Sequence, residues 1–276
     1  MKILPKTLLL KPAQQALAAL AVALASQAVH AGSFDDFFTR IIRDDASGIA
    51  SLVQRGFDPN TLNDKGETGL TQAFKLDSFR AAQGLINTPS VNVNLPNAKG
   101  ETPLMMAAIK GQVDLAKALI ARGADVNRQG WTPLHYAVST PSEDGSDLKM
   151  LALLLDKHAY IDAASPNGTT PLMLAAQYGT RSAVQMLIEQ GADAKLKNQQ
   201  GLTAIDFAQR AERPEVVGWL AQAGGSAGGA ATASAAAAGA ASAGGKTRPA
   251  AAAPGVYVPQ QPAFPQEGRR KIQSNW

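Results

Sequence analysis

The residues of this chain that could do chemistry are few and widely spaced. The sequence holds no cysteine and three histidines, of which His30 lies near the N-terminus. The other two, His135 and His158, are isolated from each other, whereas a zinc site needs three or four ligands that converge. We therefore expect no metal site and no cofactor.

The carboxylates and the glycines also lack a catalytic arrangement. Four aspartates stand in the turns of separate units, which is typical of turn residues rather than of a catalytic carboxylate pair: Asp58, Asp125, Asp162 and Asp193. The Gly-x-Thr motifs are not followed by the lysine that a phosphate-binding loop requires. No serine has a visible histidine and aspartate partner. The sequence predicts no catalytic residue and no enzyme.

The same Gly-x-Thr motifs instead mark an internal repeat. Their glycines are 34, 30, 38 and 33 residues apart, in the order Gly66, Gly100, Gly130, Gly168 and Gly201. A period near 33 residues indicates a stack of small similar units rather than one globular core. Any binding residues must therefore be positioned by the helices and turns of these small units.

Each repeated threonine begins an apolar run, and we predict a helix there. Thr can cap a helix N-terminus, and the Pro that follows it at Pro103, Pro133 and Pro171 suits the first helical position. A second apolar run, as at 113–120, predicts a second helix, which ends at a glycine such as Gly123.

These motifs resemble the ankyrin repeat. The resemblance rests on the runs Thr102-Pro103-Leu104-Met105-Met106-Ala107-Ala108 and Gly123-Ala124-Asp125-Val126-Asn127, and on their copies along the chain. It implies an all-α solenoid of about six helix-turn-helix units joined by hairpin fingers. The units cover roughly residues 34–223, at about 34–62, 63–96, 97–127, 128–164, 165–197 and 198–223.

Two irregularities fall in the fourth unit. The segment 127–130 lacks about three residues of the usual hairpin, so we expect a blunted finger. Residues 141–145 are an acidic insertion expected to bulge between the two helices. His158 stands where other units have glycine, which predicts a strain of about 1 kcal/mol. By resemblance, His135 ties neighbouring turns together by hydrogen bonds.

The two ends of the chain differ from the repeats. Residues 1–31 have three lysines and an apolar stretch too short to span a bilayer, which predicts a signal peptide cleaved after Ala31; an amphipathic helix that stays on the protein is the alternative. Export of this kind predicts a bacterial periplasmic protein. Residues 224–276 read as a disordered Ala/Gly-rich linker and a Pro-rich basic tail, either a spacer or a docking peptide.

The charge pattern and the resemblance together define the expected binding surface. The repeat body is mildly acidic, so neither nucleic acid nor stable membrane insertion is expected. Ankyrin-like stacks bind proteins on the concave face formed by the fingers and the first helices. The candidate groove residues are Lys65, Glu67, Lys75, Lys99, Glu101, Ile109, Lys110, Arg128, Trp131, Tyr136, Asn167, Gln177, Tyr178 and Gln200. Trp131 is either a groove anchor or a filler of the gap beside the short finger.

We therefore expect a monomeric, non-enzymatic scaffold or adaptor in the periplasm that binds a protein partner. Exported ankyrin proteins that it resembles suggest support of an antioxidant enzyme such as catalase. The alternatives are an immunity protein that neutralises a secreted toxin, a host-directed effector, and a cell-wall hydrolase as the enzymatic rival.

Overall fold

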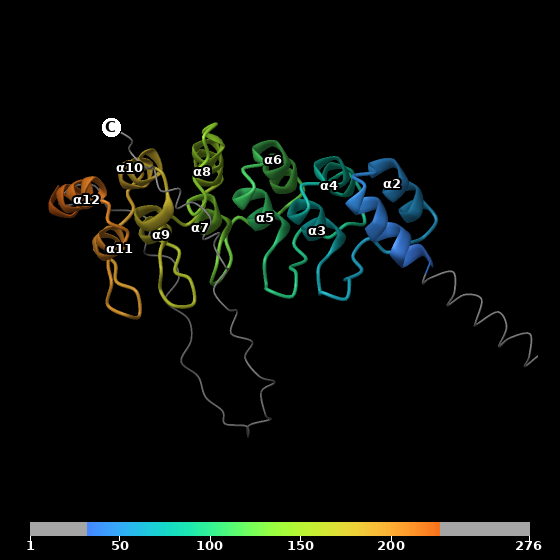
Figure 1. Cartoon of the computed structure of the whole chain (residues 1–276), viewed down its shortest axis with the longest axis horizontal. Coiled ribbons are helices and arrows are strands. Elements are labelled where there is room, and N and C mark those ends of the chain that lie inside the picture. The colour runs from blue at the N-terminus through green and yellow to red at the C-terminus, as the bar shows by residue number, and fades with distance from the viewer. Residues whose placement is uncertain (1–31, 227–276) are drawn as a thin grey trace, which may run out of the picture. The chain divides into compact units, whose positions relative to one another are not determined.

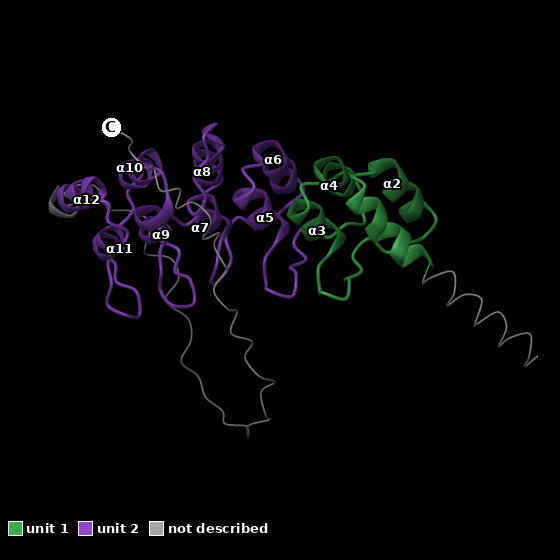
Figure 2. Cartoon of the chain, viewed as in Figure 1, with its two compact units in different colours: residues 1–92 green, residues 93–276 purple. Residues whose placement is uncertain are grey.

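The computed structural model describes residues 32–226. Within this range the regular elements are helices, apart from one isolated antiparallel bridge between Leu62 and Thr68. The described residues belong to two compact units that divide after Asn92 (Figure 2). The predicted all-α repeat architecture is confirmed.

The first unit contains two helix pairs. The first pair is a helix over 32–42 and α2 (Ala46–Gln54). The second pair is α3 (Gly69–Lys75) and α4 (Phe79–Ile86). Phe37, Ile41, Phe74 and Leu85 are fully buried and form its core. The helix over 32–42 therefore closes the N-terminal end of the stack with aromatic and aliphatic side chains.

The second unit contains four helix pairs. The pairs are α5 (Pro103–Ile109) with α6 (Val113–Ala121), α7 (Pro133–Ala137) with α8 (Ser146–Asp156), α9 (Pro171–Tyr178) with α10 (Arg181–Glu189), and α11 (Ala204–Arg210) with α12 (Pro214–Ser226). The first helices form one row and the second helices another, and the connecting loops project beneath the first row (Figure 1).

The repeated threonines begin the first helices, as predicted. Thr68, Thr102, Thr170 and Thr203 are N-caps whose hydroxyls accept from the backbone N–H three residues later. This bond satisfies one of the free donors of the first turn. At α7 the Thr132 hydroxyl instead contacts His135 Nδ1 at 2.8 Å.

Helix ends and thin helix faces set the spacing of the stack. α2, α6 and α10 are followed by Gly56, Gly123 and Gly191, each at positive φ, and α8 is followed by His158 at φ +60°. Buried alanines on the first helices, among them Ala107 and Ala175, let neighbouring pairs approach closely.

The insertion at 141–145 precedes α8 and is anchored by a buried carboxylate. Asp147 accepts from the Ser142 hydroxyl at 2.7 Å and from the Thr180 hydroxyl at 3.2 Å. Glu143 and Asp144 stay exposed. The acidic loop therefore reaches solvent with its tip while its base is held to the next repeat.

The predicted signal peptide lies outside the described residues, and so does the predicted tail beyond Ser226, where α12 ends. No helix within 32–226 has the length and apolar character needed to cross a membrane.

Candidate functional site

The loops that project between helix pairs, here called fingers, share one construction. At 63–67 the Asn63 N–H donates to the Glu67 carbonyl at 2.9 Å, and the Gly66 N–H donates to the Asn63 carbonyl at 2.8 Å. The Asn63 side chain accepts from the N–H groups of Lys65 and Glu67. The fingers at 97–101 and 198–202 repeat this pattern, and at 165–169 Ser165 replaces the asparagine. Each finger is therefore held in shape before anything binds.

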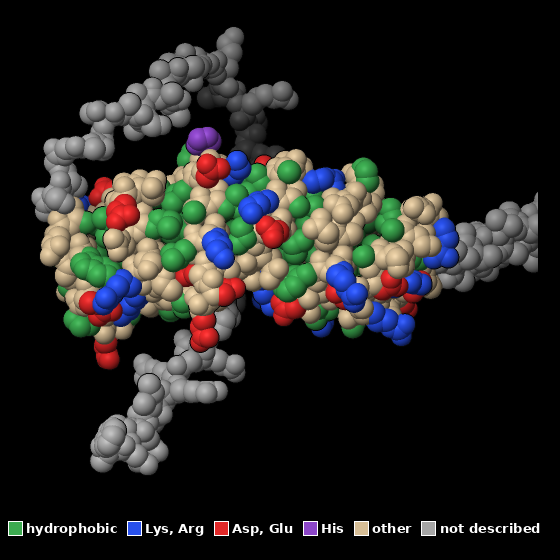
Figure 3. Space-filling model, turned by 90° about the horizontal axis from the view of Figure 1, so that it is seen from above, with side chains coloured by type: hydrophobic (Ala, Val, Ile, Leu, Met, Phe, Trp, Pro, Cys, Tyr) green, Lys and Arg blue, Asp and Glu red, His purple; other side chains and the backbone are tan. Residues whose placement is uncertain are grey.

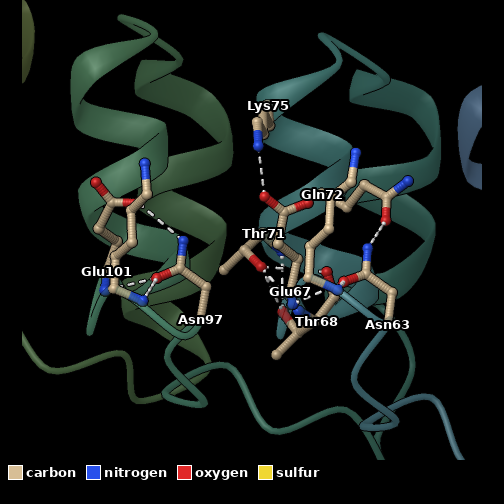
Figure 4. Close-up of polar contacts among 10 residues, drawn as sticks. Asn63, Glu67, Thr68, Thr71, Gln72, Lys75, Asn97 and Glu101 are labelled. Carbon is tan, nitrogen blue, oxygen red and sulfur yellow. Dashed lines mark hydrogen bonds and ion pairs between the residues drawn. The ribbon is translucent and has the colours of Figure 1, made fainter. Parts of the chain in front are cut away.

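The carboxylates at two finger bases have different partners (Figure 4). In the first unit Glu67 forms an ion pair with Lys75 of α3. In the second unit Glu101 accepts from the Asn97 amide at 2.8 Å and from the Tyr136 hydroxyl at 3.4 Å. The two carboxylates occupy the same position in their fingers, but they differ in their partners and in their exposure.

The finger before α7 is blunted, as predicted. The Asn127 side chain donates to the His158 carbonyl and accepts from the Tyr160 N–H, both at 2.8 Å. Asn94 makes the same pair of bonds one repeat earlier, but three fewer residues separate Asn127 from the threonine that caps the next helix.

Two side chains beside the blunted finger bond to the preceding finger. Arg128 donates to the Gly100 carbonyl of the preceding finger at 3.0 Å. Tyr136 is only 3% exposed, and burial together with the adjacent Glu101 carboxylate raises the pKa of its phenol. Tyr136 therefore packs in the interior and reaches a polar partner with its hydroxyl.

Trp131 lies at this short finger with part of its surface open. Its ring meets the His135 ring edge-on, with 5.3 Å between centroids, and the residue is half-buried. Trp131 therefore covers His135 with one part of the indole and presents another part to solvent.

The other candidate groove residues differ in exposure. Lys65, Glu67 and Lys75 belong to the first unit, and the rest belong to the second. The exposed candidates are Lys65, Lys75, Lys99, Tyr178 and Gln200; the half-buried ones are Glu101, Ile109, Lys110, Arg128, Trp131, Asn167 and Gln177; Glu67 and Tyr136 are buried.

His135 and the turn aspartate Asp162 form hydrogen bonds between neighbouring repeats. His135 is fully buried, and its Nε2 lies 3.0 Å from the Thr169 carbonyl of the next repeat. Burial lowers the pKa of the imidazole to about 4, because the charged form loses its hydration. Asp162 accepts from the Asp193 N–H at 3.0 Å, and desolvation raises the pKa of its carboxyl. Among residues 32–226 no cluster of three histidine, cysteine or acidic residues could hold a metal ion.

One feature of the first unit was not anticipated from the sequence. A pocket of about 240 Å³, which we call the Phe34 pocket, is lined by Phe34, Phe38, Leu76 and the finger and α3 residues Glu67, Gln72 and Lys75. The available signal was Gln72 itself. It stands four residues after the repeat threonine, where the other units have the apolar residues Met106, Tyr136, Leu174 and Phe207.

The stack of helix pairs, threonine caps and fingers defines a class of repeat protein, and sequence comparison identifies its family. The family model described as "Ankyrin repeats (3 copies)" matches residues 41–129, 79–164 and 142–228. The chain belongs to the ankyrin-repeat family. Ankyrin repeats are protein-interaction domains, and this chain therefore carries one.

The relatives are longer proteins. The chain is 28% identical over 157 residues to ankyrin repeat and SAM domain-containing protein 6 of Rattus norvegicus, covering 57% of this chain and 14% of that protein. It is 31% identical to the B-cell lymphoma 3 protein homolog of Mus musculus, covering 54% of this chain and 34% of that protein. The chain thus spans a minor part of these relatives' own length.

A solved structure matches more completely. It is a chain in the complex of a predatory endopeptidase from Bdellovibrio bacteriovorus with an immunity protein, with a TM-score of 0.56 and 30% identity. The alignment covers 68% of this chain and 97% of that chain.

Proposed function

We propose that this protein is a non-catalytic binding module that holds a protein partner through its fingers and the adjacent ends of its first helices. The observation that carries the proposal is the set of exposed side chains on preorganised fingers, such as Lys99 and Gln200, in an ankyrin-repeat chain. A rigid finger lowers the ordering cost of association, because little backbone freedom is lost on binding.

Figure 3 shows one face of the molecule from above, coloured by side-chain type. There, basic and acidic side chains are interspersed with apolar ones, and no large region of one sign stands out. Such a mixed surface supports solubility rather than the binding of a strongly charged polymer.

We place the protein in the periplasm on the character of residues 1–31 alone. Fractionation of the native host tests this placement, and N-terminal sequencing of the purified protein should find Gly32 as its first residue. A cytosolic protein that keeps Met1 would overturn the assignment.

Crosslinking in intact cells tests partner binding. We expect a specific crosslinked partner that is lost in the double variant Trp131→Ala and Tyr178→Ala, because large aromatic side chains dominate interface energies. Tyr160→Ala is the matched control, since Tyr160 is 68% exposed, lies in the loop after α8 and is not among the candidate groove residues. Equal loss in both variants, or no partner at all, would contradict the proposal.

A more specific candidate is an immunity protein that inhibits a peptidase. The similarity to a chain in the endopeptidase–immunity complex, covering 97% of that chain, favours it. The purified protein should then inhibit an endopeptidase encoded beside its gene at equimolar concentration. Support of an antioxidant enzyme predicts instead that a neighbouring catalase loses activity in cells that lack this protein. Turnover of cell-wall fragments by the purified chain would favour a hydrolase over both.

A further inference from the structure

The exposed carboxylates of the second unit belong to elements other than its fingers and first helices, which we call the finger side. They lie on second helices, in the loops that precede α8 and α12, or in the turns that follow α6 and α10: Asp114, Asp125, Glu143, Asp144, Asp156, Glu189, Asp193, Glu212 and Glu215. Exposed lysines such as Lys117 and Lys149 are interspersed with them. Among the described residues 93–226, the finger side carries no exposed carboxylate.

Two half-buried carboxylates do belong to the finger side, and both accept hydrogen bonds from the protein itself. Glu101 accepts from the Asn97 amide and the Tyr136 hydroxyl. Asp206 accepts from the N–H and the hydroxyl of Thr203, both at 2.7 Å, and so completes the cap of α11. Their charge is therefore directed to groups within the repeats.

The cations of the finger side outnumber these two carboxylates. They are Lys99, Lys110, Arg128 and Arg210. Lys99, in the finger at 97–101, and Arg210, at the end of α11, are exposed, and the other two are half-buried. The finger side of this unit is therefore net positive, although the repeat body as a whole is mildly acidic.

A bond between adjacent fingers brings two of these cations together. Arg128 donates from Nη1 to the Gly100 carbonyl at 3.0 Å, and Gly100 directly follows Lys99. This bond uses one of the N–H donors of the guanidinium group, which has several. Trp131, in the same short finger as Arg128, is half-buried. We call Lys99, Arg128 and Trp131 the cationic site.

The chemistry of the cationic site favours a carboxylate ligand with an apolar neighbour. A guanidinium group pairs with a carboxylate through parallel N–H donors, and an ammonium group adds a second positive charge. A single exposed ion pair contributes little, so binding requires more than one carboxylate. The indole of Trp131 offers apolar surface beside the charges, as interface anchors commonly do.

The two following fingers limit the length of the charged segment. The fingers at 165–169 and 198–202 carry no charged residue. A nucleic acid would meet too few cations here, because its binding depends on many phosphate contacts. Amide groups such as those of Asn167 and Gln200 suit the neutral remainder of a protein surface.

We propose that the cationic site binds a short acidic segment of the protein partner, in which aspartate or glutamate side chains meet Lys99 and Arg128 and an apolar side chain packs against Trp131. This inference rests on the proposed protein-binding function and names the chemistry of the partner.

Nuclear magnetic resonance of the isotope-labelled full chain, titrated with the peptide acetyl-ELEELE-amide, tests the site directly. We expect shifts of the Trp131 indole N–H and of backbone amides at 98–101 and 128–131, with a dissociation constant of about 1 mM at about 50 mM salt. The affinity should fall about tenfold at about 500 mM salt, because exposed ion pairs are screened. The basic peptide acetyl-KLKKLK-amide should leave these signals unchanged.

The double variant Lys99→Glu and Arg128→Gln should lower the affinity for the acidic peptide about tenfold. Lys149→Glu with Lys157→Gln is the matched control, because it changes the net charge of the same unit equally at exposed positions of α8 and its C-cap. The control should bind as the wild type does. Lys99→Glu alone, at an exposed position of the finger, should lower the affinity about fivefold and keeps the test valid if the double variant is unfolded by circular dichroism.

The outcomes separate the cationic site from the proposed function. Equal weakening in the control, shifts confined to residues outside 97–131, or tighter binding of an oligothymidylate than of the acidic peptide would each overturn the acidic-segment assignment. Capture of a crosslinked partner that survives Lys99→Glu with Arg128→Gln but is lost in the Trp131 and Tyr178 variant would also overturn it, while leaving the protein-binding function intact. A protein that captures no partner would instead refute the proposed function, whatever the peptide titration gives.

Discussion

At the scale of single residues, His158 carries a local cost that the other repeats avoid. Its φ of +60° lies in the left-handed region. At the equivalent position, three other second helices are followed by a glycine with positive φ. His158→Gly should therefore raise the free energy of unfolding by about 1 kcal/mol. Urea denaturation followed by circular dichroism measures this change.

Gly123→Ala is the matched control for backbone strain. Gly123 has φ +84°, and a Cβ there would meet nothing within 4 Å, so only the backbone conformation opposes alanine. We expect a loss of about 1 kcal/mol. If both substitutions left stability unchanged, the strain at these helix ends would be negligible.

Asp162 differs from the side chains at the equivalent position of three other repeats, each of which makes two hydrogen bonds to the backbone of the next repeat. In each of three repeats an asparagine accepts from one backbone N–H of the next repeat and donates to a carbonyl two residues before it: Asn60, Asn94 and Asn127. Asp162 accepts from the Asp193 N–H, but an ionised carboxylate has no donor for the matching carbonyl of Gly191.

Asp162→Asn should stabilise the protein by about 1 kcal/mol at neutral pH, since it adds that donor and removes a desolvated charge near Asp193. The pKa of Asp162 is raised in the folded state, so its ionised form costs stability above that pKa, and this cost disappears as the pH falls. The gain should therefore shrink on acidification and be nearly absent below about 3.8, the ordinary pKa. A gain that is the same at pH 7 and pH 3 would argue against this explanation.

At the scale of elements, the insertion before α8 depends on Asp147. Its carboxylate is 5% exposed and holds Ser142 and Thr180 together by hydrogen bonds. Asp147→Ala should lower the free energy of unfolding by about 2 kcal/mol, because two part-buried hydroxyl donors lose their acceptor. Thermal denaturation gives the comparison with Glu143→Ala, an exposed residue of the same loop for which little change is expected.

Two side chains link the blunted finger to the preceding finger. Arg128 reaches the preceding finger with its guanidinium, and Tyr136 sends its hydroxyl to Glu101. The short interval in the sequence predicted the defect. The side chains that make these bonds could not be deduced, because they depend on which repeats pack side by side.

At the scale of the whole stack, each repeat depends on its neighbours. Arg213, just before α12, donates from Nη1 to the carbonyls of Ala175 and Ala176 near the end of α9, at 3.0 and 2.9 Å. These charge-assisted bonds reach carbonyls in the last turn of α9, where the Ala175 carbonyl also accepts from the Gly179 N–H.

Arg213→Ala should therefore loosen the C-terminal pair, at a cost of about 2 kcal/mol. Hydrogen exchange should accelerate across α11 and α12 much more than across α5 and α6, because a repeat contacts only adjacent repeats. Arg210→Ala, on the exposed side of α11, is the control and should leave exchange nearly unchanged. Uniform acceleration along the unit would contradict this local coupling.

Local signals predicted most of the fold but less of the candidate site. A threonine cap, a following proline and a helix-ending glycine act within a few residues, so helix positions such as that of α5 could be deduced directly. Exposure depends on contacts a full repeat away. Tyr136 was proposed for the groove, and it is buried because its partners lie one repeat earlier.

The sequence by itself determined the repeat period, the helix boundaries and the ankyrin family, since these follow from short motifs that recur. It also located the short finger and the strained His158. Only the tertiary structure decided that Gln72 is buried with its side chain bonded to Asn63, and that Phe34, Phe38 and Leu76 line one pocket with it. The physical reason is that hydrogen-bond satisfaction and burial depend on side chains far apart in the sequence, which meet only when the helix pairs stack.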